Sequence, residues 1–132
     1  MKTVKEIKEF LANSHGTEKY HRVSSTPNAP ITTDGVVGLA QMANCFWLLD
    51  AIISHQRNPK LDPDMQVWKL EKLACNLDSD FEFLLTGTNG DGDEPIVKQF
   101  IPYSDFPLDE ITLLVMSGGP KGNRVILLPS EY

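Results

Sequence analysis

The feature that most constrains the fold is a change of hydrophobic period after Pro63. From there on, apolar and polar residues alternate along segments rich in β-branched and aromatic residues, a pattern typical of half-buried strands. Turn residues such as Asp78-Ser79 and Asn89-Gly90 separate these segments. The pattern predicts about five strands, within residues 65–77, 80–88, 96–103, 109–117 and 124–129. Because the connections are short, we expect an antiparallel meander.

Helical patterns precede the strands. Thr3 and Glu6 form a T-x-x-E capping box, and an apolar stripe at helical spacing follows it. Gly16 is placed to end this first helix as a left-handed cap. Residues 17–24 are then expected to be extended, and the prolines of residues 25–30 indicate a loop.

The main helical pattern covers residues 34–57. Thr33 or Asp34 supplies its N-cap, and Asn58-Pro59 ends it. Gly38 favours a close crossing or a break, as do residues 43–45, so the segment is either one helix or two shorter ones. Residues 46–53 are apolar on most sides, which is typical of a helix covered on more than one face.

These patterns predict one α+β domain over residues 1–132 with two layers. The helical part, about residues 1–60, is expected to pack on the sheet part, about residues 64–130. A chain of 132 residues is close to the commonest domain size. The apolar fraction of 41% and the charged fraction of 23% are typical of globular domains and exclude a wholly disordered chain.

The composition also predicts a cytoplasmic protein. No run approaches the roughly 18 apolar residues that a membrane span requires. The start, MKTVKEIKEFLANS, lacks the apolar block of a secretory signal. Cys45 and Cys75 do not form a disulfide framework, so both are expected to be reduced, buried thiols.

Charge is distributed unevenly along the chain. Residues 1–60 have a balance of +2 and residues 61–132 a balance of −8, which gives the net charge of −6. Such acidity argues against a general binder of nucleic-acid backbones, which requires clustered basic residues. It is compatible with docking on a basic protein. That hypothesis predicts one acidic face formed by Asp78, Asp80, Glu82, Asp91, Asp93 and Glu94.

Two polar residues interrupt the most apolar run. Asp50 and His55 are five residues apart, so on a helix they project about 140° apart and do not readily act together. We interpret Asp50 as a carboxylate hydrogen-bonded to the ring N–H of Trp47, to Ser54 or to a backbone donor. The alternatives are a partner-facing role and catalysis. His55 suits a helix cap or the surface, because the helix dipole favours a cation there.

Motifs of established chemistry do not match. The histidines lack metal-ligand spacing, and Asn89 to Phe100 fails as a calcium loop at its sixth and twelfth positions. The glycine-rich residues 117–123 are not a phosphate loop. Neither cysteine has a neighbouring histidine or basic residue to lower its pKa. We therefore predict no catalytic residue, no metal and no cofactor.

Aromatic and polar residues outside the expected core are candidates for interaction. Tyrosine and arginine are enriched at the energetic centres of protein interfaces, although such residues also occur at the edge of a core. The candidates are Tyr20, His21 and Arg22 in the first extended segment, Tyr103, Asp105 and Phe106 between two strands, and Tyr132.

Five segments resemble a family of short bacterial proteins of unknown function. They are GTEKYHR, TDGVVGLAQMANCFWLLDAIISHQ, QVWKL, IPYSDFPLDEITL and LLPSEY, and the resemblance covers most of residues 16–132. The family has a second tyrosine where His21 stands, which puts a shared histidine chemistry in doubt. The resemblance implies a setting in mobile elements, phages and plasmids, where accessory proteins modify host enzymes or host defence. It implies no catalytic residue.

Three hypotheses of function follow. The leading one is a non-enzymatic protein-interaction module that uses its acidic sheet half or residues 20–22, with modulation of a host defence enzyme as a specific version. The second is a small hydrolase or nucleic-acid-processing enzyme that uses Asp50 with His21 or His55. The third is a homo-oligomeric structural protein that pairs through an exposed sheet edge.

Overall fold

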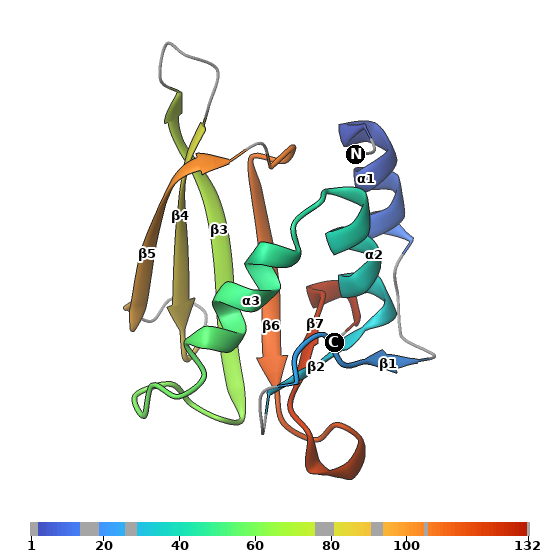
Figure 1. Cartoon of the computed structure of the whole chain (residues 1–132), viewed down its shortest axis with the longest axis vertical. Coiled ribbons are helices and arrows are strands. Elements are labelled where there is room, and N and C mark those ends of the chain that lie inside the picture. The colour runs from blue at the N-terminus through green and yellow to red at the C-terminus, as the bar shows by residue number, and fades with distance from the viewer. Residues whose placement is uncertain are drawn as a thin grey trace.

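The computed structural model describes residues 3–13, 19–25, 29–75, 81–90, 94–104 and 106–131, which form three α-helices and one sheet (Figure 1). The helices are α1 (Val4–Ala12), α2 (Asp34–Met42) and α3 (Phe46–Ser54). The strands are β1 (Tyr20–His21), β2 (Ile31–Thr33), β3 (Met65–Cys75), β4 (Phe81–Thr88), β5 (Val97–Ser104), β6 (Glu110–Met116) and β7 (Val125–Leu127). Two 3₁₀ turns, Pro120–Gly122 and Pro129–Glu131, flank β7.

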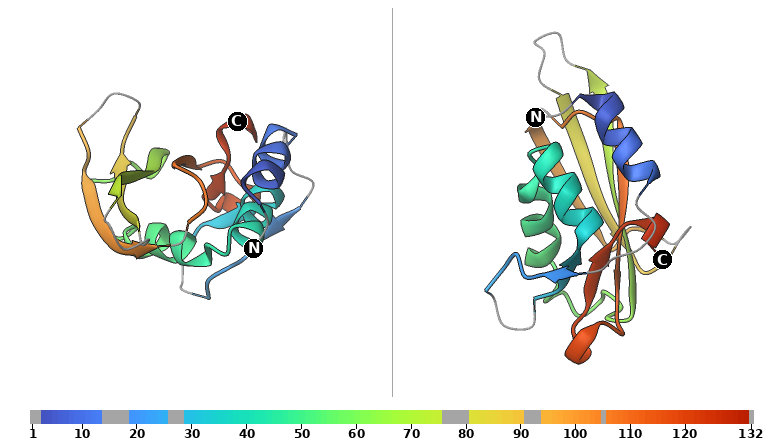
Figure 2. Two further views of the ribbon diagram at one scale, coloured as in Figure 1. Left: turned by 90° about the horizontal axis from the view of Figure 1, so that it is seen from above. Right: turned by 90° about the vertical axis from the view of Figure 1, so that its right-hand side faces the viewer.

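The helices and the sheet form separate layers, so the predicted α+β class is confirmed. Figure 2 shows α2 and α3 on one side of the strands. The main core lies between these layers and includes Leu49, Ile52, Trp68, Phe83 and Val115, all buried. In the described ranges, no helix has the length and apolar character needed to cross a membrane.

The sheet differs from the prediction of about five strands in an antiparallel meander. It has seven strands in the order β1-β2-β7-β6-β3-β4-β5, and β2 runs parallel to β7. The two additional strands contain two and three residues, too few to show a period. In addition, β6 pairs with β3 instead of β5, and the connection that follows β5 buries Phe106 and Leu108 in the core.

The long apolar segment forms two helices, the second of the two alternatives. Thr33, the first of the two predicted candidates, is the N-cap of α2, and its hydroxyl accepts a hydrogen bond from the Val36 amide (3.3 Å). The break falls at Asn44, which has a φ of 52° and so cannot continue a helix. Gly38 permits the predicted close crossing, because a Cβ there would lie 2.3 Å from the Phe10 ring of α1.

The first helix begins as predicted but ends earlier. Thr3 is its N-cap, and the Thr3 hydroxyl accepts a hydrogen bond from the Glu6 amide (3.2 Å). The helix ends at Ala12, and the side-chain amide of Asn13 donates to the Glu9 carbonyl (2.9 Å). This hydrogen bond provides a donor for one of the last carbonyls of the helix, which in a helix with a glycine cap is bonded by a backbone amide. Gly16, the predicted end, lies outside the described residues.

Candidate functional site

Asp50 lies on the exposed side of α3. Within the described part of the chain, no hydrogen bond or ion pair involves its carboxylate, and the Ser54 hydroxyl donates to the Ala51 carbonyl (2.6 Å) instead. The predicted bond between Asp50 and Trp47 or Ser54 is therefore not formed. The physical reason is the orientation of α3, which turns the neighbouring Leu49 into the core and leaves Asp50 towards solvent.

Each histidine of the proposed catalytic pairs bonds to a different residue. His21 Nε2 lies 2.5 Å from Asp34 Oδ1. His55 Nε2 lies 2.8 Å from Gln99 Oε1, and its ring stacks on Trp68 with 5.7 Å between centroids. Asp50 is thus a hydrogen-bond partner of neither histidine, and the pair that the alternative enzyme hypothesis requires is not assembled. His55 instead joins the end of α3 to β5 and β3.

The His21–Asp34 pair lies at the start of α2. Asp34 is the first residue of that helix, where the helix dipole favours a carboxylate. Its second oxygen accepts a hydrogen bond from the Lys19 amide (3.1 Å). Both side chains of the pair are partly exposed. Sequence reasoning missed this pair because the two residues are 13 positions apart. The only signal in the sequence was Asp34 itself, an acidic residue directly after the helix cap Thr33.

Sequence reasoning also missed a buried polar network. Gln66 Oε1 accepts hydrogen bonds from Trp68 Nε1 (2.8 Å) and Gln56 Nε2 (2.8 Å). Gln56 Oε1 accepts hydrogen bonds from Gln66 Nε2 (3.0 Å) and from Arg124 Nη1. Burial lowers the pKa of the Arg124 guanidinium. Because the amide groups satisfy one another, this network is best explained as a structural link between α3, β3 and the start of β7.

A second apolar cluster lies on the sheet face opposite α2 and α3, which we call the open face. Cross-strand pairing arranges its members in two rows. One row contains Ile31, Val125, Met116 and Met65, and the other contains Leu127, Leu114 and Val67. In the right-hand view of Figure 2, α2 and α3 lie together on the other side of the strands. Four of its members, Ile31, Leu114, Val125 and Leu127, are only 6–9% exposed. Met65, Val67 and Met116 are half-buried, so only part of the open face is accessible.

Charged side chains border the open face along β3. Lys69 Nζ lies 3.2 Å from Glu71 and 3.7 Å from Glu110. The hydrogen bond and charge of Glu71, together with the charge of Glu110, raise the pKa of Lys69. Exposed ion pairs of this kind contribute little to stability. They give the apolar rows a polar rim, which is the usual composition of a protein-binding surface.

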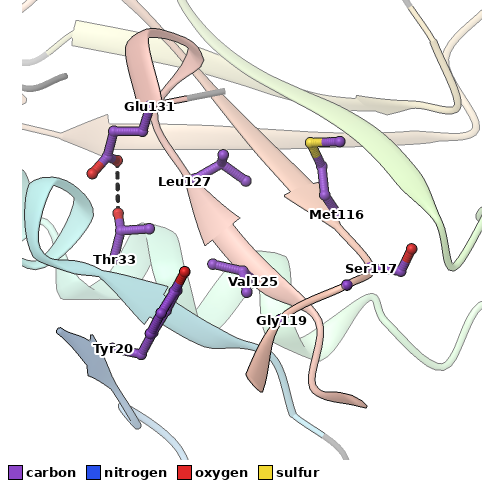
Figure 3. A pocket seen from close by; sticks show the side chains of 9 residues that line it. Tyr20, Thr33, Met116, Ser117, Gly119, Val125, Leu127 and Glu131 are labelled. Carbon is purple, nitrogen blue, oxygen red and sulfur yellow. Dashed lines mark hydrogen bonds between the residues drawn. The ribbon is translucent and has the colours of Figure 1, made fainter. Parts of the chain in front are cut away.

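A pocket of about 290 Å³ adjoins the open face (Figure 3). Its lining residues come from β1, β2, β6, β7 and the segments that follow β6 and β7: Tyr20, Thr33, Met116, Ser117, Gly118, Gly119, Val125, Leu127 and Glu131. Backbone hydrogen bonds from Gly119 to the Asn123 carbonyl (3.0 Å) and from Gly122 to the Gly119 carbonyl (3.2 Å) fix the loop that forms one wall. The pocket is therefore preformed on its loop side.

Glu131 is the only formally charged residue among the described residues that line the pocket. Its Oε1 accepts hydrogen bonds from the Thr33 hydroxyl (2.7 Å) and the Leu128 amide (2.9 Å). Its Oε2 is buried and has no hydrogen-bond partner. A Cβ on Gly35 would lie 2.9 Å from both oxygens, so the carboxylate packs on the first turn of α2. Thr33 and Glu131 are 98 positions apart, and only the fold brings them together.

The other predicted site residues are dispersed. Tyr20 lines the pocket, Arg22 is exposed, and Trp47 is half-buried on α3. Phe106 is part of the core. Predictions for Asp78, Asp80, Asp91, Asp93, Asp105, Tyr132 and the side chain of Tyr103 lie outside the described residues. Glu82 and Glu94, the described members of the predicted acidic face, lie near opposite ends of β4. The described part of this set does not form a cluster.

Metal binding and thiol chemistry find no support at these positions. Across the residues that the structure describes, no three or more His, Cys, Asp or Glu side chains are arranged to hold a metal ion. Cys45 is a free, buried thiol, and burial raises its pKa to about 12. A thiol with such a pKa is not a nucleophile near neutral pH. Among the described residues, the pocket beside the open face is the candidate site that combines an apolar lining with a carboxylate.

The chain belongs to a family of unknown function (DUF6876), whose profile matches residues 5–132. No curated protein and no solved structure matches the chain. The match agrees with the sequence resemblance in one respect, that the family is of unknown function, and its description assigns neither an activity nor functional residues.

Proposed function

We propose that this protein is a non-enzymatic interaction module that binds another protein with its open face and the adjoining pocket. The observation that carries the proposal is the pair of apolar rows on the face opposite α2 and α3, bordered by charged side chains. The accessible part of these rows is Met65, Val67 and Met116 beside the pocket, and accessible apolar surface with a polar rim marks interaction sites. A net charge of −6 favours a basic partner, because opposite charge steers association.

Catalysis is the weaker candidate. The proposed enzyme needs Asp50 within hydrogen-bond reach of His21 or His55, directly or through one water. Both histidines bond to other side chains, and Asp50 faces solvent. An orienting carboxylate is present for His21 in Asp34, but among the described residues no hydroxyl or thiol forms a hydrogen bond with its imidazole ring. The Thr32 hydroxyl donates to the His21 backbone carbonyl instead (3.2 Å).

We further propose a setting for this interaction. The protein acts in the bacterial cytoplasm as an accessory protein of mobile DNA, and its partner is a host enzyme, including enzymes of host defence. The support for this setting is the sequence resemblance. The acidic charge balance suits a partner whose binding surface is basic.

Affinity capture with matched variants tests the proposed surface. Met116→Lys places a charge at the pocket beside the open face, whereas Phe46→Lys makes the same change in charge on the helix layer, where Phe46 is 40% exposed. Thermal unfolding first verifies that each variant folds. The tagged wild type and both variants are then incubated with lysate of the cells in which the protein naturally occurs. We expect one dominant partner with wild type and Phe46→Lys, and its loss with Met116→Lys.

Hydrogen exchange of the purified complex then locates the interface. Protection of amides in β7 and residues 117–119 is expected, because these segments contribute to the pocket. Retention of the partner by Met116→Lys together with its loss in Phe46→Lys would assign binding to the helix layer and contradict the proposal. Failure to capture any protein with the wild type would also count against it.

A further inference from the structure

The pocket beside the open face combines apolar walls with one carboxylate. Met116, Val125 and Leu127 provide aliphatic surface, and Tyr20, which is 44% exposed, provides an aromatic ring. The volume of about 290 Å³ is at the lower limit for small-molecule sites, so it suits one large side chain better than a drug-sized ligand. The chemistry of the walls therefore indicates what kind of side chain enters.

The charge of Glu131 lacks a cationic counterpart. Among the described residues, no lysine, arginine or histidine forms an ion pair with its carboxylate. Oε1 accepts hydrogen bonds from two neutral donors, the Thr33 hydroxyl and the Leu128 amide. The dipole of α2 adds only a partial positive charge. Glu131 is partly buried, and its Oε2 is shielded from solvent without a partner. Such an oxygen is normally paired, because an uncompensated charge is costly in an apolar environment. A cation in the pocket would reduce this cost.

The pocket walls favour the same ligand. Long basic side chains cover apolar surface with their aliphatic stems while their charged ends seek a carboxylate. A guanidinium group also stacks on a tyrosine ring, which an ammonium group does less well. Arginine is moreover enriched at the centres of protein interfaces. These properties match the aliphatic floor, the carboxylate and the ring of Tyr20.

We propose that the pocket binds an arginine side chain of the partner protein, with its stem on Met116, Val125 and Leu127 and its guanidinium between Tyr20 and Glu131. This inference rests on the proposed function and specifies the partner residue at its site. It assigns to Glu131 a binding role in addition to its structural bond with Thr33.

Titration of the ¹⁵N-labelled full chain with Nα-acetyl-arginine N-methylamide tests this site. The citrulline counterpart has nearly the same shape without the charge and serves as the matched ligand. We expect saturable shifts of the amides of Thr33, Gly119, Val125 and Leu127 with the arginine compound. We expect about tenfold weaker binding of the citrulline compound, since a hydrogen bond to a charged group is worth more than a neutral one.

Two variants assign the interaction to particular residues. Glu131→Gln keeps an acceptor for Thr33 and Leu128 but removes the charge, and should weaken arginine binding about tenfold. Glu94→Gln removes an exposed charge elsewhere and should leave binding unchanged. Tyr20→Leu keeps this side of the pocket apolar but removes the aromatic ring, and should weaken arginine binding several-fold. It provides an independent test if Glu131→Gln does not fold. Equal binding of both compounds, or shifts confined to other residues, would overturn the inference.

The experiments distinguish a failure of the arginine assignment from a failure of the proposed function. If the captured partner protects the open face from exchange but the arginine compound does not bind, the arginine assignment alone is wrong. If the arginine compound binds the pocket while the partner protects the helix layer, the pocket is a cation site and the interaction module uses another surface.

Discussion

Among single residues, Cys45 shows how burial controls chemistry. Burial raises its pKa from 9.0 to about 12, so the folded state favours the protonated thiol. Its contribution to stability is fully present below pH 9, the value of the unfolded chain, and is lost as pH rises towards 12. We predict that iodoacetamide at pH 8 modifies Cys45 only through unfolding.

Peptide mapping by mass spectrometry measures this modification, with the urea-unfolded chain as the control. The unfolded chain should react at the rate of an ordinary thiol, whereas the folded chain should be strongly protected. Modification of Cys45 at equal rates in the two states would show that the thiol is accessible in the folded protein.

Residue types were easier to predict than their partners. Tyr20 was identified as an interaction candidate from its type and extended context, and it lines the pocket. Asp34 and Glu131 are ordinary surface acids in the sequence. Their roles come from His21 and Thr33, which lie 13 and 98 positions away. A single sequence contains no signal for such pairing, because side-chain periodicity describes only neighbours within one element.

Between elements, the contact of β3 with β4 depends on a glycine. Gly87 is the cross-strand partner of Trp68, and a Cβ at Gly87 would lie 2.8 Å from the tryptophan ring. That ring is buried, bonded to Gln66 and stacked on His55, so it has no room to move. We predict that Gly87→Ala lowers the free energy of unfolding by about 1–3 kcal/mol, as overpacked cores do, measured by urea titration.

A double-mutant cycle separates this clash from the general effect of changing a strand residue. Trp68→Phe destabilises the core by itself, but its smaller ring leaves space for the new methyl group. The double variant should therefore be less destabilised than the sum of the two single variants. Additive effects would mean that Gly87→Ala acts through backbone propensity and not through the tryptophan ring.

The starts of two helices were predicted correctly from local signals, whereas helix ends and pairings between distant elements were not. The starts of α1 and α2 followed from Thr3 and Thr33, because a cap bonds to an amide three residues away. The parallel pairing of β2 with β7 joins segments about 90 positions apart and involves strands of only three residues. Such strands form because the assembled sheet stabilises them, and their own sequence shows no period.

For the whole molecule, the sheet edges bear on the third hypothesis, a homo-oligomer. The β1 edge has only two residues, which is too short for extensive pairing. The eight-residue β5 edge carries Lys98 and Pro102, and its register with β4 shifts near Phe81. Lysine, proline and bulges are the usual means by which proteins prevent edge-to-edge pairing. These features favour a monomer over an edge-paired oligomer.

The edge features lead to a prediction about association. Phe100 in β5 is 52% exposed and lies between Lys98 and Pro102 in the sequence. Without this lysine and this proline, the β5 edge would be an apolar strand prone to pair with another chain. We predict that the wild type is a monomer by size-exclusion chromatography with light scattering, and that Lys98→Val with Pro102→Val forms dimers or aggregates.

Lys60→Val provides the control for this comparison, because it removes the same charge from an exposed residue outside the sheet. It should stay monomeric. A wild-type dimer protected from hydrogen exchange along β5 would instead support the homo-oligomer. A dimer protected at β7 would mean that a second copy of the chain is the partner of the open face. A monomer leaves that face for a different protein, and its unpaired carboxylate then indicates an arginine as the residue to look for in that protein.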